Sequence, residues 1–147
     1  MAEQDLIKLA RENVELFNRG DWTAYEQSMA PDCVYHEYAT QQRVQGARQV
    51  VETDKVWKRA FPDAKGTIRS VLPSGNTAVV EVTWAGTQTG PLEGPAGTIP
   101  PSGKRAEVQA VLILTFEGGK VKESCQYFDL LGMLQQIGAI PEMARAT

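Results

Sequence analysis

Apolar positions in the first half of the chain recur every three or four residues, which is typical of amphipathic helices. Such a stripe predicts a helix over residues 4–18, and Gly20 closes it. Asp21 is placed to cap a second short helix that ends before Pro31. A third apolar stripe predicts a helix over residues 47–60.

The second half of the chain changes to an alternation with a period of two residues, which is typical of strands. It predicts four long strands joined by short turns, over residues 65–72, 77–87, 104–116 and 120–128. A shorter strand is predicted over residues 33–39 and a last helix over residues 130–137. The segment 90–103 holds four prolines and four glycines, so we expect a long loop without regular structure.

Helices that precede the strands in the sequence predict an α+β domain, with three amino-terminal helices packed in a strongly curved antiparallel sheet. One domain over residues 1–147 is expected, because 147 residues with 42% hydrophobic content suit a single core. A single sheet wrapped around one long helix leaves an open end lined by several strands. Small ligands bind in such openings.

Composition excludes several classes of function. With 15 basic and 18 acidic residues the net charge is −3, so nucleic acid is an unlikely partner. No apolar run is long enough to span a membrane, and an acidic start predicts a cytoplasmic location rather than export. Cys33 and Cys125 form no CxxC pair, and the single histidine, His36, excludes a multi-histidine metal site.

Several short motifs carry a family resemblance through their order and spacing. They are Asn18-Arg19-Gly20-Asp21-Trp22, Ala60-Phe61-Pro62-Asp63, Gly86-Thr87-Gln88-Thr89-Gly90 and Asp129-Leu130-Leu131-Gly132. Together they make the chain similar to the SnoaL-like polyketide cyclases, also called ester cyclases, over nearly its whole length. The resemblance implies a nuclear-transport-factor-2-like (NTF2-like) cone with an apolar pocket. It also implies a homodimer formed through the sheet and a small apolar or polyketide-like ligand.

The chemistry described for that family is a cofactor-free aldol closure of a polyketide methyl ester, and Asp129 resembles its working carboxylate. One group that removes a proton beside a carbonyl and delivers a proton to a carbonyl oxygen suffices for this reaction. We expect apolar burial to raise the pKa of Asp129 so that it can do both near neutral pH. The alternative is that Asp129 only caps the helix that follows it.

His36 is a second candidate catalytic residue, provided that it shares a cavity with Asp129; otherwise it is a partly buried core histidine. Six further residues are expected to line the substrate pocket, and they are Tyr38, Trp57, Trp84, Gln88, Cys125 and Tyr127. Many relatives carry His in place of Gln88 and Trp in place of Cys125, so the resemblance does not transfer a substrate.

Two other functions remain open at this point. The loss of a family histidine at Gln88 favours a module on the same fold that binds a ligand or dimerises without catalysis. A hydrolase using an activated water would need several polar groups around that water. Only Asp129, His36 and Gln88 are candidates for this role in the sequence. The segment 90–103 is either a lid over the pocket or a long connection between strands.

Overall fold

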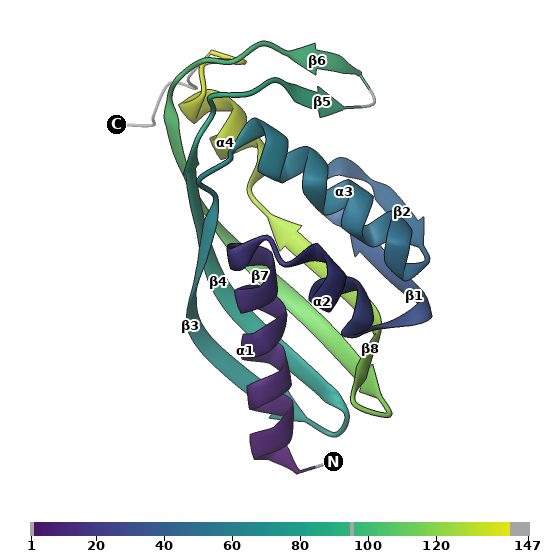
Figure 1. The fold of residues 1–147 in the computed structure, drawn as a ribbon. Helices are drawn as coiled ribbons and strands as arrows, with labels where there is room; N and C mark the ends of the chain where they lie inside the picture. Colours follow the sequence, from purple (N-terminus) through teal and green to yellow (C-terminus); the bar gives the residue numbers. More distant parts are fainter. Residues whose placement is uncertain (1, 95, 142–147) are drawn as a thin grey trace.

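The computed structural model describes residues 2–94 and 96–141 and has the α+β architecture expected from the sequence (Figure 1). The first helix closes at Gly20 and the second is capped by Asp21 as predicted, but the second helix ends at Gln27, earlier than predicted. Gly20 takes a left-handed conformation (φ 67°), and the Asp21 carboxylate accepts a bond from the backbone N–H of Ala24. The four helices are α1 (Glu3–Arg19), α2 (Trp22–Gln27), α3 (Ala47–Ala60) and α4 (Leu130–Gln136).

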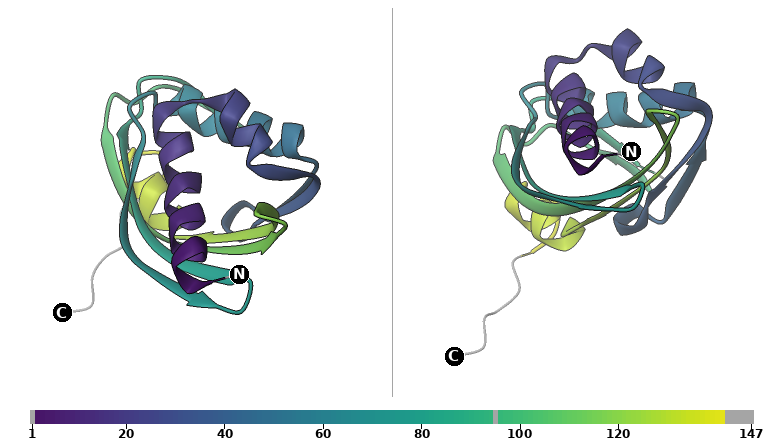
Figure 2. Two further views of the ribbon diagram at one scale, coloured as in Figure 1. Left: turned by 60° about the horizontal axis from the view of Figure 1, so that its bottom comes forward. Right: turned by 90° about the horizontal axis from the view of Figure 1, so that it is seen from below.

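A six-stranded sheet with the order β2-β1-β8-β7-β4-β3 curls around α1 (Figure 2). Its strands are β1 (Met29–Glu37), β2 (Gln42–Gln45), β3 (Lys65–Ser74), β4 (Thr77–Thr87), β7 (Arg105–Glu117) and β8 (Lys120–Phe128). All neighbours are antiparallel except β1 and β8, so the sheet is mixed and the expectation of a wholly antiparallel sheet is wrong. Short turns fix the direction of the hairpins, but no short turn joins β1 to β8.

Three local differences from the sequence prediction concern short strands. β1 begins at Met29, before the predicted start, and β2 was not predicted at all. The segment 90–103 is not devoid of regular structure, because it contains a small hairpin of β5 (Leu92–Gly94) and β6 (Gly97–Ile99). Pro91, Pro100 and Pro101, which argued against strands in this segment, lie outside β5 and β6.

The main core lies between α1 and the concave face of the sheet. Leu6, Ala10 and Val14 of α1 are buried against Val80 of β4 and Leu114 of β7. A second apolar cluster gathers at the end of the molecule where α4 and the β5–β6 hairpin lie (Figure 1). Within the described ranges, no helix is long and apolar enough to cross a membrane.

Candidate functional site

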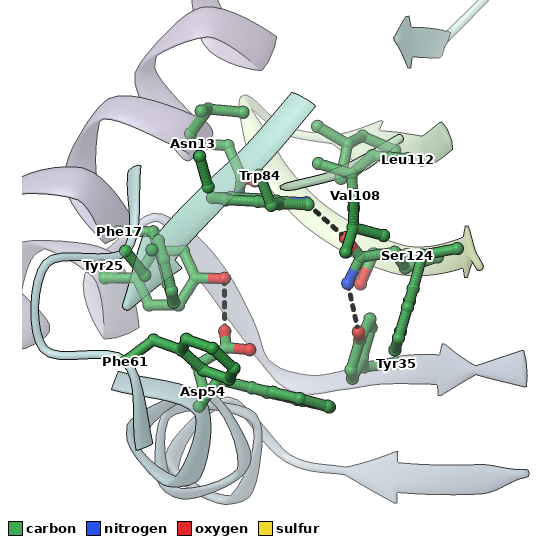
Figure 3. A pocket seen from close by; sticks show the side chains of 18 of the residues that line it. Asn13, Phe17, Tyr25, Tyr35, Asp54, Phe61, Trp84, Val108, Leu112 and Ser124 are labelled. Carbon is green, nitrogen blue, oxygen red and sulfur yellow. Dashed lines mark hydrogen bonds between the residues drawn. The ribbon is translucent and has the colours of Figure 1, made fainter. Parts of the chain in front are cut away.

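A cavity of about 120 Å³ lies between the two apolar clusters, bounded by α1, α3 and the inner faces of β4, β7 and β8 (Figure 3). Most of its lining is aliphatic or aromatic. Among the residues that the structure describes, no lysine, arginine or histidine lines it. The polar side chains along its wall, apart from the tryptophans, are Asn13, Tyr25, Tyr35, Asp54, Ser124 and Gln126.

Asp54 is the one carboxylate of the described residues that lines this cavity, and its side chain is held by Tyr25. The Tyr25 hydroxyl donates to Asp54 Oδ2 over 2.7 Å (Figure 3). Burial raises the pKa of Asp54 to about 7; the Tyr25 hydrogen bond opposes this shift and the nearby Glu37 charge adds to it. Asp54 is therefore present in both protonation states near neutral pH.

Tyr25 acts only as a donor in this pair. Burial, followed by the charge of Asp54, raises the pKa of Tyr25 well above its ordinary value. The phenol therefore keeps its proton throughout the physiological range, and it fixes one oxygen of the Asp54 carboxyl group.

A second hydrogen-bond network crosses the other wall of the cavity. Trp84 Nε1 donates to Gln126 Oε1, Gln126 Nε2 donates to the Tyr35 hydroxyl, and that hydroxyl donates to Glu37 Oε2, each over 2.8 Å. Four strands of the sheet lie within this span, because β4 carries Trp84, β7 separates it from β8 with Gln126, and β1 carries Tyr35. The network fixes the shape of the wall.

Glu37 is the fully buried end of that network and is saturated with donors. Besides the Tyr35 hydroxyl, Trp57 Nε1 donates to Oε2 over 3.1 Å and the Thr40 hydroxyl donates to Oε1 over 2.7 Å. A buried carboxylate is stable only when it is bonded in this way. Glu37 therefore locks α3, through Trp57, onto β1.

Two of the residues expected in the pocket, Trp57 and Trp84, do line the cavity. The Trp84 ring packs over Gly66 of β3, where a Cβ atom would overlap the ring. Asn18 of α1 holds Gly66 with two hydrogen bonds, of 2.9 Å and 2.7 Å. The position of Trp84 is thus set from both α1 and β3.

Asp129 does not line the cavity. Its side chain is exposed and caps α4, with Oδ1 accepting from the Gly132 N–H over 2.9 Å. The apolar surroundings expected around this carboxylate are absent, and the alternative role of helix cap is the one that the structure displays.

Four other candidate site residues lie on the outer surface of β1 and β8 or directly after β1. His36 is one of them and does not line the cavity, so the condition for pairing it with Asp129 is not met. The rings of His36 and Tyr38 stack with centroids 5.5 Å apart, and those of Tyr38 and Tyr127 stack at 4.8 Å. Cys125 is half-buried beside them. Successive side chains of a strand point to opposite faces, so the neighbours of these residues point inward. Those inward neighbours are Tyr35, Glu37, Ser124 and Gln126.

Gln88 is fully buried, but its side chain bonds to the backbone of the segment 90–103 and does not face the cavity. Its Nε2 donates to the carbonyl of Pro100 over 3.1 Å, and its Oε1 accepts from the Ser102 N–H over 3.2 Å. It is not among the lining residues. The exchange of a family histidine for Gln88 therefore says nothing about chemistry inside this cavity.

None of the six polar cavity residues named above was among the expected site residues, although the sequence holds a signal for two of them. Asp54 follows Val50 by four residues and precedes Trp57 by three, so it lies on the apolar stripe of α3. Asn13 lies three residues after Ala10 on the apolar stripe of α1. A polar residue on the buried stripe of an amphipathic helix is the pattern that would have found both.

Solved structures that resemble this chain share its fold. AclR from Streptomyces galilaeus has a TM-score of 0.83 at 23% sequence identity, covering 98% of this chain and 87% of AclR. TsrD from Streptomyces laurentii has a TM-score of 0.80 at 25% identity, covering 95% of this chain and 99% of TsrD. No curated protein gives a significant match.

A protein of Jannaschia sp. CCS1 described as SnoaL-like polyketide cyclase has a TM-score of 0.79 at 26% identity, with 95% of each chain covered. These likenesses agree with the NTF2-like cone that the resemblance implied. The family model of the SnoaL-like polyketide cyclases matches residues 7–137. This match spans most of the sequence, and the chain therefore belongs to the SnoaL-like polyketide cyclase family.

Proposed function

We propose that this chain is an enzyme that moves a proton within a small carbonyl- or ester-bearing molecule without a cofactor, and that Asp54 is its acid/base group. The observation that carries the proposal is a carboxyl group in an apolar cavity whose pKa burial raises to about 7. A general acid/base works best when its pKa lies near the operating pH. From the sequence alone, we expect a pKa raised by apolar burial at Asp129. Asp54 is the carboxyl group that meets this requirement.

The geometry of the Asp54 carboxyl group suits proton transfer. Tyr25 occupies Oδ2, while Oδ1 accepts no hydrogen bond from the residues that the structure describes. Oδ1 takes a proton from the carbon beside the substrate carbonyl, leaving an enolate. Asp54 then delivers a proton, either the one it took or one exchanged with solvent, to an oxygen or carbon of the substrate, and so returns to its starting state.

Family membership supports the carbonyl-bearing substrate, because polyketides are chains of carbonyl groups and aldol closure begins with proton removal beside one of them. The resemblance of the motifs points to Asp129 as the proton carrier instead. The two carboxylates differ in surroundings, since Asp54 lines the cavity and Asp129 is an exposed cap. The experiment therefore compares both.

Deuterium exchange tests this proposal without knowledge of the natural substrate. Acetophenone is incubated with the protein in D₂O, and NMR follows deuterium entering its methyl group. Asp54→Asn is expected to lower the enzyme-dependent rate by about 100-fold or more, the usual contribution of a general base. Asp129→Asn, the matched control, is expected to keep most of the rate.

The opposite pattern, with exchange retained in Asp54→Asn and lost in Asp129→Asn, would return the role to Asp129. Binding of acetophenone without any exchange in the wild type would favour the non-catalytic ligand-binding module. Both outcomes would refute Asp54 as an acid/base group.

We also propose that the chain forms a homodimer through the outer face of the sheet. Tyr38 and Tyr127 are 47% and 48% exposed and stack on one another there. Exposed aromatic surface of this kind is typical of interaction sites. Sedimentation velocity is expected to show a dimer that Tyr127→Arg dissociates, and a monomeric wild type would contradict this proposal.

A further inference from the structure

Asn13 is a buried polar residue in the cavity that nothing so far has given a role. It projects from the middle of α1, on the same stripe as Ala10 and Val14, and is only 9% exposed. Its side chain makes no hydrogen bond within residues 2–94 and 96–141, and it lines the cavity. No fully buried polar side-chain atom among the described residues lacks a partner, so the polar atoms of Asn13 are accessible from the cavity. Its amide is therefore free to bond to a ligand group that enters the cavity.

Among the described residues, every other polar side chain of the cavity wall except Ser124 has at least one partner, although Asp54 Oδ1 accepts no hydrogen bond. Tyr25 bonds to Asp54, and Gln126 bonds to both Trp84 and Tyr35. A serine hydroxyl has a single donor, which can rotate toward a nearby backbone carbonyl, whereas the Asn13 amide carries two N–H donors and an acceptor oxygen. Asn13 is therefore the polar side chain of the cavity wall with the most unused hydrogen-bonding groups.

The charge of the cavity limits what that ligand group can be. No cationic side chain of the described residues lines the cavity, and Asp54 places a carboxylate there above pH 7 or so. An anionic ligand would be buried without a counter-ion and would be repelled by Asp54. The ligand oxygen that meets Asn13 is thus uncharged on binding.

We infer that the Asn13 amide N–H binds the carbonyl oxygen of an uncharged ligand and is the specificity-determining group of the cavity. The inference rests on the proposed function for the choice of a carbonyl compound. Asn13 and Asp54 belong to two different helices and lie apart in Figure 3. Asn13 can therefore hold the oxygen, on which negative charge develops, while Asp54 takes the proton from the neighbouring carbon.

Three probes of nearly the same shape test this assignment by titration calorimetry at pH 8. Acetophenone carries the carbonyl, α-methylstyrene replaces its oxygen by a methylene group, and benzoate adds a charge. The wild type is expected to bind acetophenone about tenfold more tightly than α-methylstyrene, the value of one hydrogen bond. Benzoate is expected to bind at least as weakly as α-methylstyrene.

Asn13→Leu keeps the branched shape of the side chain and removes its amide. It is expected to abolish the tenfold preference while leaving the affinity for α-methylstyrene within about twofold, which shows that the cavity persists. Ser124→Ala, the matched control, is expected to keep the preference. Loss of the preference in Ser124→Ala but not in Asn13→Leu, or tight binding of benzoate to the wild type, would overturn the inference.

Asp54→Asn separates this inference from the proposed function. The variant should still prefer acetophenone to α-methylstyrene, because binding the oxygen requires no proton transfer. If wild-type exchange is absent but the preference exists and depends on Asn13, the proposed acid/base function fails and the binding role of Asn13 stands. If exchange occurs but Asn13→Leu leaves the preference intact, the binding role fails alone.

Discussion

The two faces of β1 and β8 differ sharply, although they are built from adjacent residues of the same strands. On the inner face, Tyr35 and Gln126 belong to a buried hydrogen-bond network that ends at Glu37. On the outer face, His36 and Tyr127 join an exposed aromatic stack through Tyr38. A shift of one residue along a strand therefore decides whether a polar group is desolvated and able to act on an enclosed ligand.

The same contrast separates two aspartates that look alike in the sequence. Asp54 sits on the buried stripe of a helix, and burial raises its pKa to about 7. Asp129 sits at the end of a strand, is exposed and bonds to the backbone of the following helix. Residue type and a family motif do not distinguish these two environments, but the spacing of neighbouring apolar residues does.

The largest expected effect comes from removing the buried end of the inner network. Glu37→Ala leaves the donors of Tyr35, Thr40 and Trp57 without an acceptor, which should lower the free energy of unfolding by about 5 kcal/mol. His36→Ala, on the outer face, should change it by less than about 1 kcal/mol. Urea denaturation measures both, and equal effects would remove the contrast between the faces.

The raised pKa of Asp54 should make the free energy of unfolding depend on pH. Its pKa is raised on folding from 3.8 to about 7, so the folded state binds more protons between these values. Stability should therefore fall as pH rises from about 4 to about 7, by at most about 4 kcal/mol. Asp54→Asn should flatten this fall and be the more stable protein at pH 8, as measured by urea denaturation; an unchanged slope would contradict the burial argument.

Gln88 provides a smaller effect that should spare the cavity. Gln88→Ala removes the bonds to Pro100 and Ser102 and should lower the free energy of unfolding by about 2 kcal/mol. Proteolysis within residues 90–103 should become faster, while the affinity for acetophenone stays within about twofold. A large loss of affinity would indicate that this segment acts as a lid after all.

The smallest difference concerns the two cysteines. Burial raises the pKa of Cys33 to about 11, and its side chain is 2% exposed, whereas Cys125 is half-buried on the outer face. A thiol reagent should therefore label Cys125 in the native protein, slowly, and Cys33 only after unfolding. Rapid labelling of Cys33 in the native state would show that β1 opens locally.

The sequence was sufficient for the elements with strong periodicity and for the family. The stripes of α1 and α3 and the alternation in β4, β7 and β8 each bury a continuous apolar face, so pattern and structure agree. The parallel pairing of β1 with β8 could not be predicted, because it depends on how distant segments meet. The short hairpin of β5 and β6 was hidden by the prolines that flank it.

The site was harder to predict because it depends on which face of each strand turns inward. Trp84 shares a face of β4 with the buried Val80 and Val82, and it lines the cavity as expected. β1 offers no such guide, because both Tyr35 and His36 suit a strand and either could have been the inner residue. Tertiary packing of α3 against β1, through Trp57 and Glu37, settles the choice.

A carbon-13 NMR titration of the Asp54 carboxyl group tests the central claim most directly. With the side-chain carboxyl carbons of aspartate labelled and Asp54→Asn used for assignment, the account predicts a resonance that titrates with a midpoint of about 7. A midpoint near 4, the range of an exposed aspartate, would contradict the claim that this cavity holds a proton carrier for neutral pH.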